Sequence, residues 1–263
     1  MKGDNKQELT KAMLRDYMNE PNRGFIPEIT DDPVTNIFID CKIWFDWIKQ
    51  NGYENLPFKE YEGEYEKFRL KYDADARFYN ETLNDPVAAF RGDTVTSFYS
   101  LYKEVLNRIT GLTFHKSNNP LDELIAKRNE PGFKEANDRF IKFAEINNTA
   151  GNFMLLPRRE MNVARYRCSQ DRIDKSLYEC FPDGALAKYF GTNEEMQLEN
   201  LLDWIKSQNL EMMFKNSEIT RDNIIPFNKN NPFVMYKNMT LDELDEFLNN
   251  VVKLIKERNK IYG

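Results

Sequence analysis

The segment Gly151-Asn-Phe-Met-Leu-Leu-Pro157 separates this chain from a purely helical one. Its four consecutive apolar residues lie between a glycine and a proline, and so short a run between helix-breaking residues is typical of a buried strand. The residues that follow, as far as Tyr166, are expected to pair with this strand as a hairpin. The sequence therefore predicts one small β element in a chain whose other apolar patterns are helical.

Helical periodicity accounts for most of the remaining sequence. Apolar residues three and four positions apart predict helices that begin at Pro33, after Asp93 and at Asp171. Gly111 is expected to end the second of these helices. Pro131 is expected to interrupt the helical structure that begins near residue 119, ahead of a further helix over residues 133–143.

Several polar residues have the spacing of N-terminal helix caps. Asp32 precedes Pro33, whose missing N–H is harmless in a first turn. Two later pairs have the spacing of a capping box. These pairs are Thr192 with Glu195, and Thr240 with Glu243.

The second capping box predicts a C-terminal helix over residues 239–260. Arg258 is expected to lie near the end of this helix, where the helix dipole favours a cation. Between residues 207 and 237 the chain is rich in asparagine and predicts irregular packed loops. The apolar face of the final helix is expected to comprise Leu244, Phe247, Leu248, Val251, Leu254 and Ile255.

These patterns together predict a mostly α protein with a small β-hairpin element, of the α+β class. The chain has 263 residues, 41% of them hydrophobic, which is enough to form a core without disulfides or metals. No internal repeat or low-complexity linker divides the sequence. We therefore expect a single compact domain over residues 1–263.

Composition also limits the location and the partners of the protein. No apolar stretch resembles a secretory signal or reaches the ~20 residues needed to cross a bilayer, which predicts a cytoplasmic protein without a membrane partner. Cys41, Cys168 and Cys180 lack paired spacing, as is typical of reduced thiols. The abundance of lysine, asparagine, isoleucine and glutamate suits an AT-rich bacterial or phage genome.

The charge balance disfavours nucleic acid as a partner. The formal net charge is −6 and the sequence pI is about 5.2, so the surface as a whole repels a polyanion. A local basic strip stays open as an alternative. Its candidate residues are Arg158, Arg159, Arg165 and Arg167.

The chemistry-bearing residues exclude several enzyme classes. His115 is the single histidine, which excludes zinc sites with two or three histidines and HExxH proteases. The sequence contains no GxxxxGK[ST], GxGxxG or GxSxG motif, so nothing indicates a P-loop, a dinucleotide-binding fold or a hydrolase nucleophile elbow. No cofactor is expected, and whether the protein is an enzyme stays open.

Two polar segments, residues 91–98 and 148–167, form the candidate site. Arg91 and Arg165 could hold an anionic group, while Asp93, Asn152 and Asn162 orient a small anionic or nucleotide-like ligand. The alternative is structural. Asp93 would then cap the helix that follows it, and the amide and guanidinium side chains would satisfy backbone carbonyls inside a hairpin.

The same two segments resemble uncharacterised bacterial proteins of the DUF6994-like class. The similarity covers roughly residues 85–190 and implies a shared fold but no activity. The chain departs from the pattern at Asn148, where histidine is usual, at Ala150, where isoleucine is usual, and at Ile173, which replaces an aromatic residue. If the histidine of that class is catalytic, this chain lacks it. The residues that carry the resemblance are Gly92, Asp93, Thr94, Ser97, Phe98, Gly151, Asn152, Phe153, Pro157, Asn162, Arg165, Asp171 and Asp174.

Further residues support weaker hypotheses. Arg108 and His115 have the loose spacing of HEPN ribonucleases, although Gly111 between them is expected to end the helix. Cys168 lies among arginines that could lower its pKa, but without a nearby histidine it is expected to be a passive thiol. Asp171 and Asp174 could bind a divalent metal, or favour the helix dipole.

Three functions therefore stay open. The leading hypothesis is a cytoplasmic protein with a polar pocket for a small anionic or nucleotide-like ligand. The first alternative is a nuclease or toxin of host–phage conflict that acts on RNA or DNA. The second is a protein-interaction or inhibitor module without catalysis, for which an exposed aromatic patch formed by Tyr61, Tyr65 and Tyr72 would be the sign.

Overall fold

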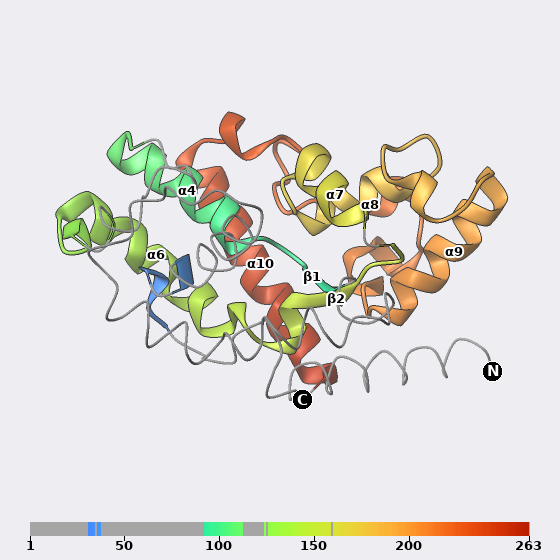
Figure 1. Cartoon of the computed structure of the whole chain (residues 1–263), viewed down its shortest axis with the longest axis horizontal. Helices are drawn as coiled ribbons and strands as arrows, with labels where there is room; N and C mark the ends of the chain where they lie inside the picture. The colour runs from blue at the N-terminus through green and yellow to red at the C-terminus, as the bar shows by residue number, and fades with distance from the viewer. Residues whose placement is uncertain are drawn as a thin grey trace, which may run out of the picture. The chain divides into compact units, whose positions relative to one another are not determined.

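The structure, a computed structural model, describes residues 31–34, 36–37, 92–112, 124, 126–158 and 160–262. The described residues form α-helices, short 3-10 turns and a two-stranded antiparallel sheet (Figure 1). The fold is therefore mostly α with a small β element, and the predicted fold class is confirmed. The chain divides into two compact units, one holding residues 20–85 and 98–148 and the other the remainder. The expectation of a single domain stays a prediction.

Two helices, α4 (Phe98–Thr110) and α6 (Pro131–Asn147), form the described core of the unit that includes residues 98–148. The Phe98 ring lies 5.3 Å from that of Phe140 and 5.0 Å from that of Phe143 between ring centroids. Tyr102 packs edge-on against Phe140 in the same cluster, and its hydroxyl donates to Asn137 Oδ1 at 2.5 Å. Aromatic pairs in such tilted and edge-on geometries stabilise a core beyond the area they bury.

Three local predictions concern helix ends in this unit. Gly111 has a φ of +72° and follows the last turn of α4, as predicted. Val34 N donates to Asp32 Oδ1 at 3.2 Å, so the predicted cap is confirmed. The predicted interruption is confirmed: helical residues 124, 126 and 127 are followed by a turn at residues 128–130, and Pro131 then begins α6. A proline at the first helical position lacks only an N–H that has no intrahelical partner anyway.

In the other unit, the sheet joins segments nearly sixty residues apart. Strand β1 (Gly92–Thr94) pairs antiparallel with β2 (Phe153–Leu155), with Asp93 opposite Met154. The strand at residues 153–155 is confirmed. The prediction that the residues following it, up to Tyr166, would pair with it as a hairpin is wrong. The residues after it form helix α7 (Met161–Ser169). Its buried stripe is Met161, Arg165 and Ser169, which is too polar to be recognised as a helical face by apolar periodicity.

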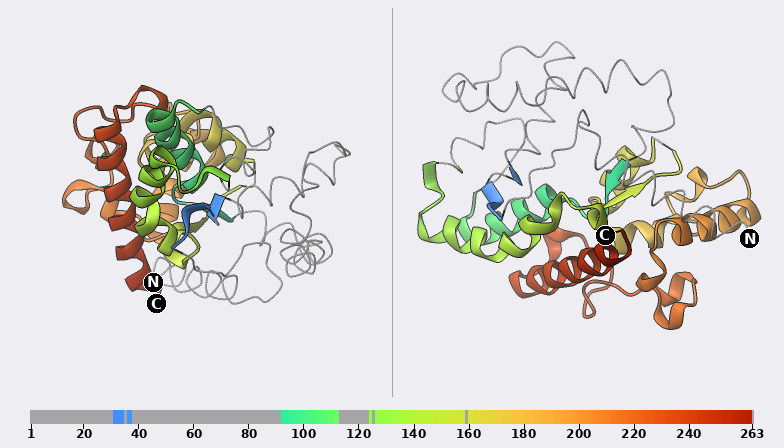
Figure 2. Two further views of the ribbon diagram at one scale, coloured as in Figure 1. Left: turned by 90° about the vertical axis from the view of Figure 1, so that its left-hand side faces the viewer. Right: turned by 90° about the horizontal axis from the view of Figure 1, so that it is seen from below.

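The described residues of this unit form three more helices. They are α8 (Ile173–Cys180), α9 (Glu194–Ser207) and α10 (Leu241–Tyr262). Between α9 and α10 the chain forms 3-10 turns such as Glu211–Met213 and Tyr236–Asn238, consistent with the predicted irregular region. Figure 2 shows α10 as one straight rod. Its buried face contains every predicted apolar residue and, unexpectedly, Arg258.

Both predicted capping boxes lie in this unit. In the box ahead of α10, Thr240 N donates to Glu243 Oε2 at 2.8 Å and Glu243 N donates to Thr240 Oγ1 at 3.2 Å, so the box is confirmed. The box at Thr192 was wrong by one residue. The cap of α9 is Asn193, whose Oδ1 accepts a hydrogen bond from Met196 N at 2.9 Å.

Several predictions concern residues outside the described ranges. They include Arg91, Cys41, His115 and most of the helix predicted after Pro33. The aromatic residues Tyr61, Tyr65 and Tyr72 also lie there. Among the residues that are described, no helix combines the length and the apolar character needed to span a bilayer.

Candidate functional site

Arg165 is the centre of a buried polar network at the end of strand β1. Its guanidinium is fully buried and makes an ion pair with the carboxylate of Asp93. Nη1 also donates to the carbonyl of Thr94 at 3.1 Å, and Nη2 donates to the carbonyl of Val95 at 3.3 Å. Nε donates to Ser176 Oγ at 3.0 Å. The network therefore links α7 to β1 and to α8.

Asn152 extends the contact between the two strands. Its carbonyl accepts a hydrogen bond from Val95 N at 2.7 Å, and its side-chain Oδ1 accepts one from Thr96 N at 3.3 Å. The side chain is fully buried. Asn152 therefore continues the antiparallel pairing one residue past β1, where an apolar side chain would leave the N–H of Thr96 without this acceptor.

Asp93 is nearly buried, and that burial sets the chemistry of its carboxylate. Burial raises the pKa of the Asp93 carboxyl, while the charge of Arg165 and the N–H of Thr94 act in the opposite direction. Thr94 N donates to Asp93 Oδ1 at 2.8 Å. Asp93 thus caps no helix, contrary to the structural alternative for this residue, because α4 begins only at Phe98.

The structure brings three of the five predicted site residues together. Asp93, Asn152 and Arg165 meet in one network, but its partners are backbone groups and side chains of the protein itself. Asn162 lies apart from them, exposed on α7, and Arg91 is outside the described residues. A ligand at these positions stays a prediction, and their observed contacts are those of a scaffold.

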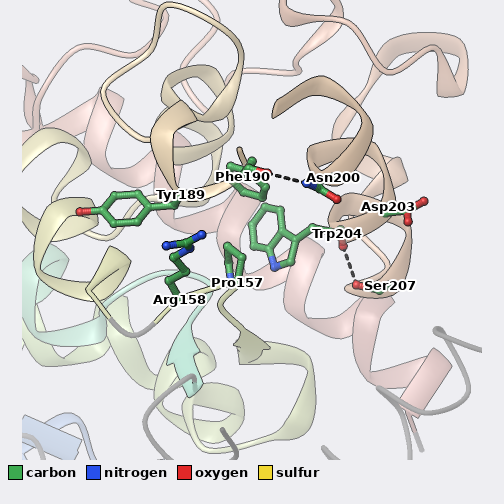
Figure 3. A pocket seen from close by; sticks show the side chains of 8 residues that line it. All are labelled: Pro157, Arg158, Tyr189, Phe190, Asn200, Asp203, Trp204 and Ser207. Carbon is green, nitrogen blue, oxygen red and sulfur yellow. Dashed lines mark hydrogen bonds between the residues drawn. The ribbon is translucent and has the colours of Figure 1, made fainter. Parts of the chain in front are cut away.

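An open cavity of about 320 Å³ lies at the end of β2 (Figure 3). None of the described predicted site residues lines it. After the last residue of β2 and Leu156, the next two residues of the chain form part of the cavity wall. The lining residues are Pro157, Arg158, Tyr189, Phe190, Asn200, Asp203, Trp204 and Ser207.

One wall of the cavity is a face of α9. Asn200, Asp203, Trp204 and Ser207 follow the three- and four-residue spacing of a single helical face. Trp204 Nε1 donates to the carbonyl of Leu155 at 2.7 Å, which fixes the indole against β2. The indole edge of Trp204 therefore has a defined position at the centre of the site.

Arg158 supplies the positive charge of the cavity. It is exposed, and within the described part of the chain its guanidinium has no ion pair and no hydrogen bond. Figure 3 shows that the guanidinium lies between Tyr189 and Trp204. Arg158 differs in this respect from Arg165, whose donors are occupied, and it is the better candidate to hold an anion.

Sequence reasoning missed most of this cavity. It considered Arg158 only as one of four arginines in a basic strip, and it did not consider Tyr189, Asn200 or Trp204. The available signal was the position of Pro157-Arg158 directly after a predicted buried strand, where functional loops commonly begin. The spacing of polar residues on α9 gave no comparable signal, because such spacing is typical of any solvated helix face.

The other candidate residues have structural contacts. Burial raises the pKa of the Cys168 thiol, in agreement with a passive thiol. Asp174 is fully buried and pairs with Arg172, with Oδ2 and Nη2 2.7 Å apart. In the described ranges, no group of three or more histidine, cysteine, aspartate or glutamate side chains has an arrangement that could hold a metal ion.

Comparisons of the chain with protein families, with curated proteins and with solved structures each find no match. The resemblance to the DUF6994-like class therefore stays a prediction.

Proposed function

We propose that this protein binds a small anionic ligand with a planar portion in the cavity between Arg158 and α9. The observation that carries the proposal is the guanidinium of Arg158, which is exposed in a concave site lined by Tyr189, Phe190 and Trp204. We also propose that the protein is located in the cytoplasm, as the sequence predicts.

The physical argument concerns the donors of Arg158. A guanidinium presents five N–H groups, and it binds phosphate or carboxylate oxygens in pairs. A cavity excludes part of the solvent around such a pair, so the interaction is stronger than one on a flat surface. The volume of about 320 Å³ lies at the lower end of the range for sites that bind small molecules.

The aromatic residues of the cavity support the second feature of the proposed ligand, its planar portion. Trp204 is almost buried and Phe190 contacts it edge-on, with 5.5 Å between ring centroids. Trp204 and Phe190 are only 7% and 4% exposed, so with the half-buried Tyr189 they offer a flat ligand a small but rigid apolar contact, at a small cost in side-chain entropy. A ligand with an acidic group attached to a planar group therefore matches both features of the cavity.

Titration calorimetry tests the proposal with ribose 5-phosphate and a series of nucleoside monophosphates as probes. We expect Arg158→Gln to weaken binding about tenfold or more, since it removes a charge-assisted hydrogen bond. Arg167→Gln is the matched control, because Arg167 is an exposed arginine of α7 that does not line the cavity. Equal losses in both variants, or unchanged binding in Arg158→Gln, would contradict the proposal.

A further inference from the structure

Two helices of the unit that contains the sheet, α7 and α9, have exposed apolar residues on their outer sides. Val163 and Tyr166 of α7 are the most exposed large apolar side chains among the described residues, and Leu198 of α9 is also exposed. Single exposed apolar side chains are ordinary, but several of them on one helical face indicate a contact surface. The charged residues beside them indicate which partner each surface fits.

The outer face of α7 is apolar and positively charged. Val163, Tyr166 and Arg167 follow the three- and four-residue spacing of one helical face, opposite the buried stripe of this helix. Within the described part of the chain, the exposed guanidinium of Arg167 forms no ion pair and no hydrogen bond. The helix itself contains no acidic residue. Tyrosine and arginine together are typical of the residues that contribute most to protein–protein binding.

The outer face of α9 is apolar and negatively charged. It comprises Glu195, Leu198, Glu199 and Leu202, which have the spacing of one helical face, and none of them lines the cavity. Both glutamates are exposed, and neither forms an ion pair or a hydrogen bond with any described residue. This face therefore offers unpaired carboxylates beside leucines, whereas the face of α7 offers an unpaired guanidinium beside a tyrosine and a valine.

We propose that two copies of this protein associate through the outer face of α7 in one copy and the outer face of α9 in the other. In this contact Arg167 meets the carboxylates of Glu195 and Glu199, and Tyr166 packs against Leu198. Opposite charges across an interface fix its register and exclude other arrangements. Each copy supplies both surfaces, because α7 and α9 belong to the same compact unit (Figure 1). The contact is therefore heterologous, with a different surface on each side.

The charges of the whole chain and of the two faces favour a second copy over another partner. A cationic partner protein would match α9 and leave the apolar residues of α7 exposed, and an acidic partner would do the reverse. Only a partner with both faces covers both, and this chain is one. The net charge of −6 opposes self-association, and two short helical faces are smaller than the about 800 Å² per partner of a standard interface. We therefore expect a dissociation constant of about 100 μM.

Sedimentation equilibrium of the full-length protein between about 5 and 500 μM measures this association. We expect the mean mass to rise with concentration. Tyr166→Ser and Leu198→Ser should each weaken the association about tenfold, because they remove apolar contacts from the centre of the interface. Ile141→Ser on α6 is the matched control, since Ile141 is 37% exposed and Leu198 is 39% exposed. This control should leave the association unchanged.

Charge reversal identifies the two faces more specifically. Arg167→Glu should abolish self-association, because it sets like charges against each other, and so should Glu195→Arg combined with Glu199→Arg. An equimolar mixture of these two variants should associate again. In the mixture every α7 face finds an α9 face of opposite charge, one pair with the native charges and one with both reversed. Lys142→Glu, at an exposed position of α6, is the control for a change of net charge alone.

Each outcome supports or contradicts the proposal. A wild-type protein that stays monomeric at the highest concentration overturns it and leaves the two faces to different partners. Association that the variants of only one helix weaken also overturns it, as does an effect of Ile141→Ser equal to that of Leu198→Ser. A mixture that stays monomeric, with both variants folded by circular dichroism, shows that the two faces do not meet.

Discussion

Two buried tyrosines differ in the partner of their hydroxyl group. Tyr102 donates to Asn137, whereas the hydroxyl of Tyr236, which is fully buried, has no hydrogen-bond partner within the described residues. The ring of Tyr236 lies 5.3 Å from the guanidinium carbon of Arg172 and packs edge-on against Phe247. A phenylalanine at position 236 would keep these ring contacts and remove a polar group that is buried without a partner.

We therefore expect Tyr236→Phe to raise the free energy of unfolding by about 1 kcal/mol at neutral pH. Tyr102→Phe is the opposite control and should lower it, because it removes a hydrogen bond and leaves Asn137 without this donor. Urea denaturation of both variants measures the two signs. A loss of stability in Tyr236→Phe would show that its hydroxyl has a partner.

The pH dependence of this difference has a defined sign. Burial raises the pKa of Tyr236 well above its ordinary value of 10.0. Above that value the unfolded chain loses the phenolic proton while the folded protein retains it, so stability falls as the pH rises. The advantage of Tyr236→Phe should therefore be larger at about pH 10.5 than at pH 7.

At the scale of single residues, the sequence indicated which polar side chains matter but not how they are used. Asp93, Asn152 and Arg165 were identified as one group, and they do meet. Arginine, amide and carboxylate side chains beside a glycine can form hydrogen bonds either with a ligand or with buried backbone groups. Which of the two occurs depends on burial. Here Arg165 of α7 is fully buried and donates to the carbonyls of Thr94 and Val95, and the polar stripe of that helix concealed this burial.

At the scale of elements, the N-terminus of α9 offers a direct test of the observed cap. Asn193→Ala should lower the free energy of unfolding by about 1 kcal/mol, since it removes the acceptor for the N–H of Met196. Thr192→Ala is the matched control with a much smaller effect expected, because its hydroxyl contacts only the sulfur of Met196. Chemical denaturation compares the two, and a larger loss in Thr192→Ala would place the cap where the sequence predicted it.

Elements were predictable where local rules decide them. The box of Thr240 and Glu243 combines two reciprocal hydrogen bonds over three residues, and it located the start of α10 within two residues. The partner of the strand at residues 153–155 could not be found in this way. Pairing with residues 92–94 is a contact across nearly sixty positions, and nothing in either short segment specifies it.

At the scale of the whole molecule, the C-terminal helix is tied to the middle of the chain. A Cβ at Gly151 would overlap the carbonyl oxygen of Ile255, so the two backbones approach as closely as glycine permits. Asn259 Oδ1 accepts a hydrogen bond from Gly151 N at 2.7 Å. Arg258 continues this contact from within the buried face of α10, whereas the sequence predicted only a cation favoured by the dipole at the end of this helix.

Arg258 holds its position through neutral acceptors. Its guanidinium donates to the carbonyl of Gly151, to that of Phe153 at 2.8 Å and to that of Gln208 at 3.1 Å. Burial lowers the pKa of Arg258, with the Tyr262 hydroxyl acting against that effect. Two contributions therefore oppose each other: the cost of a buried charge, and the cost of leaving the carbonyls of Gly151 and Phe153 without this donor if the charge is removed. The carbonyl of Gln208 would keep the hydroxyl of Tyr262 as a donor, at 3.1 Å.

The second contribution should dominate, because each unsatisfied buried carbonyl costs about 1–3 kcal/mol and methionine can refill the volume without supplying a donor. We expect Arg258→Met to lower the free energy of unfolding by at least about 2 kcal/mol, with little change in Lys256→Met, an exposed neighbour on α10. Urea denaturation with an unchanged m-value measures this. A loss below about 1 kcal/mol would mean that relief of the buried charge compensates for the carbonyls, and that shape alone joins α10 to the segment around Gly151.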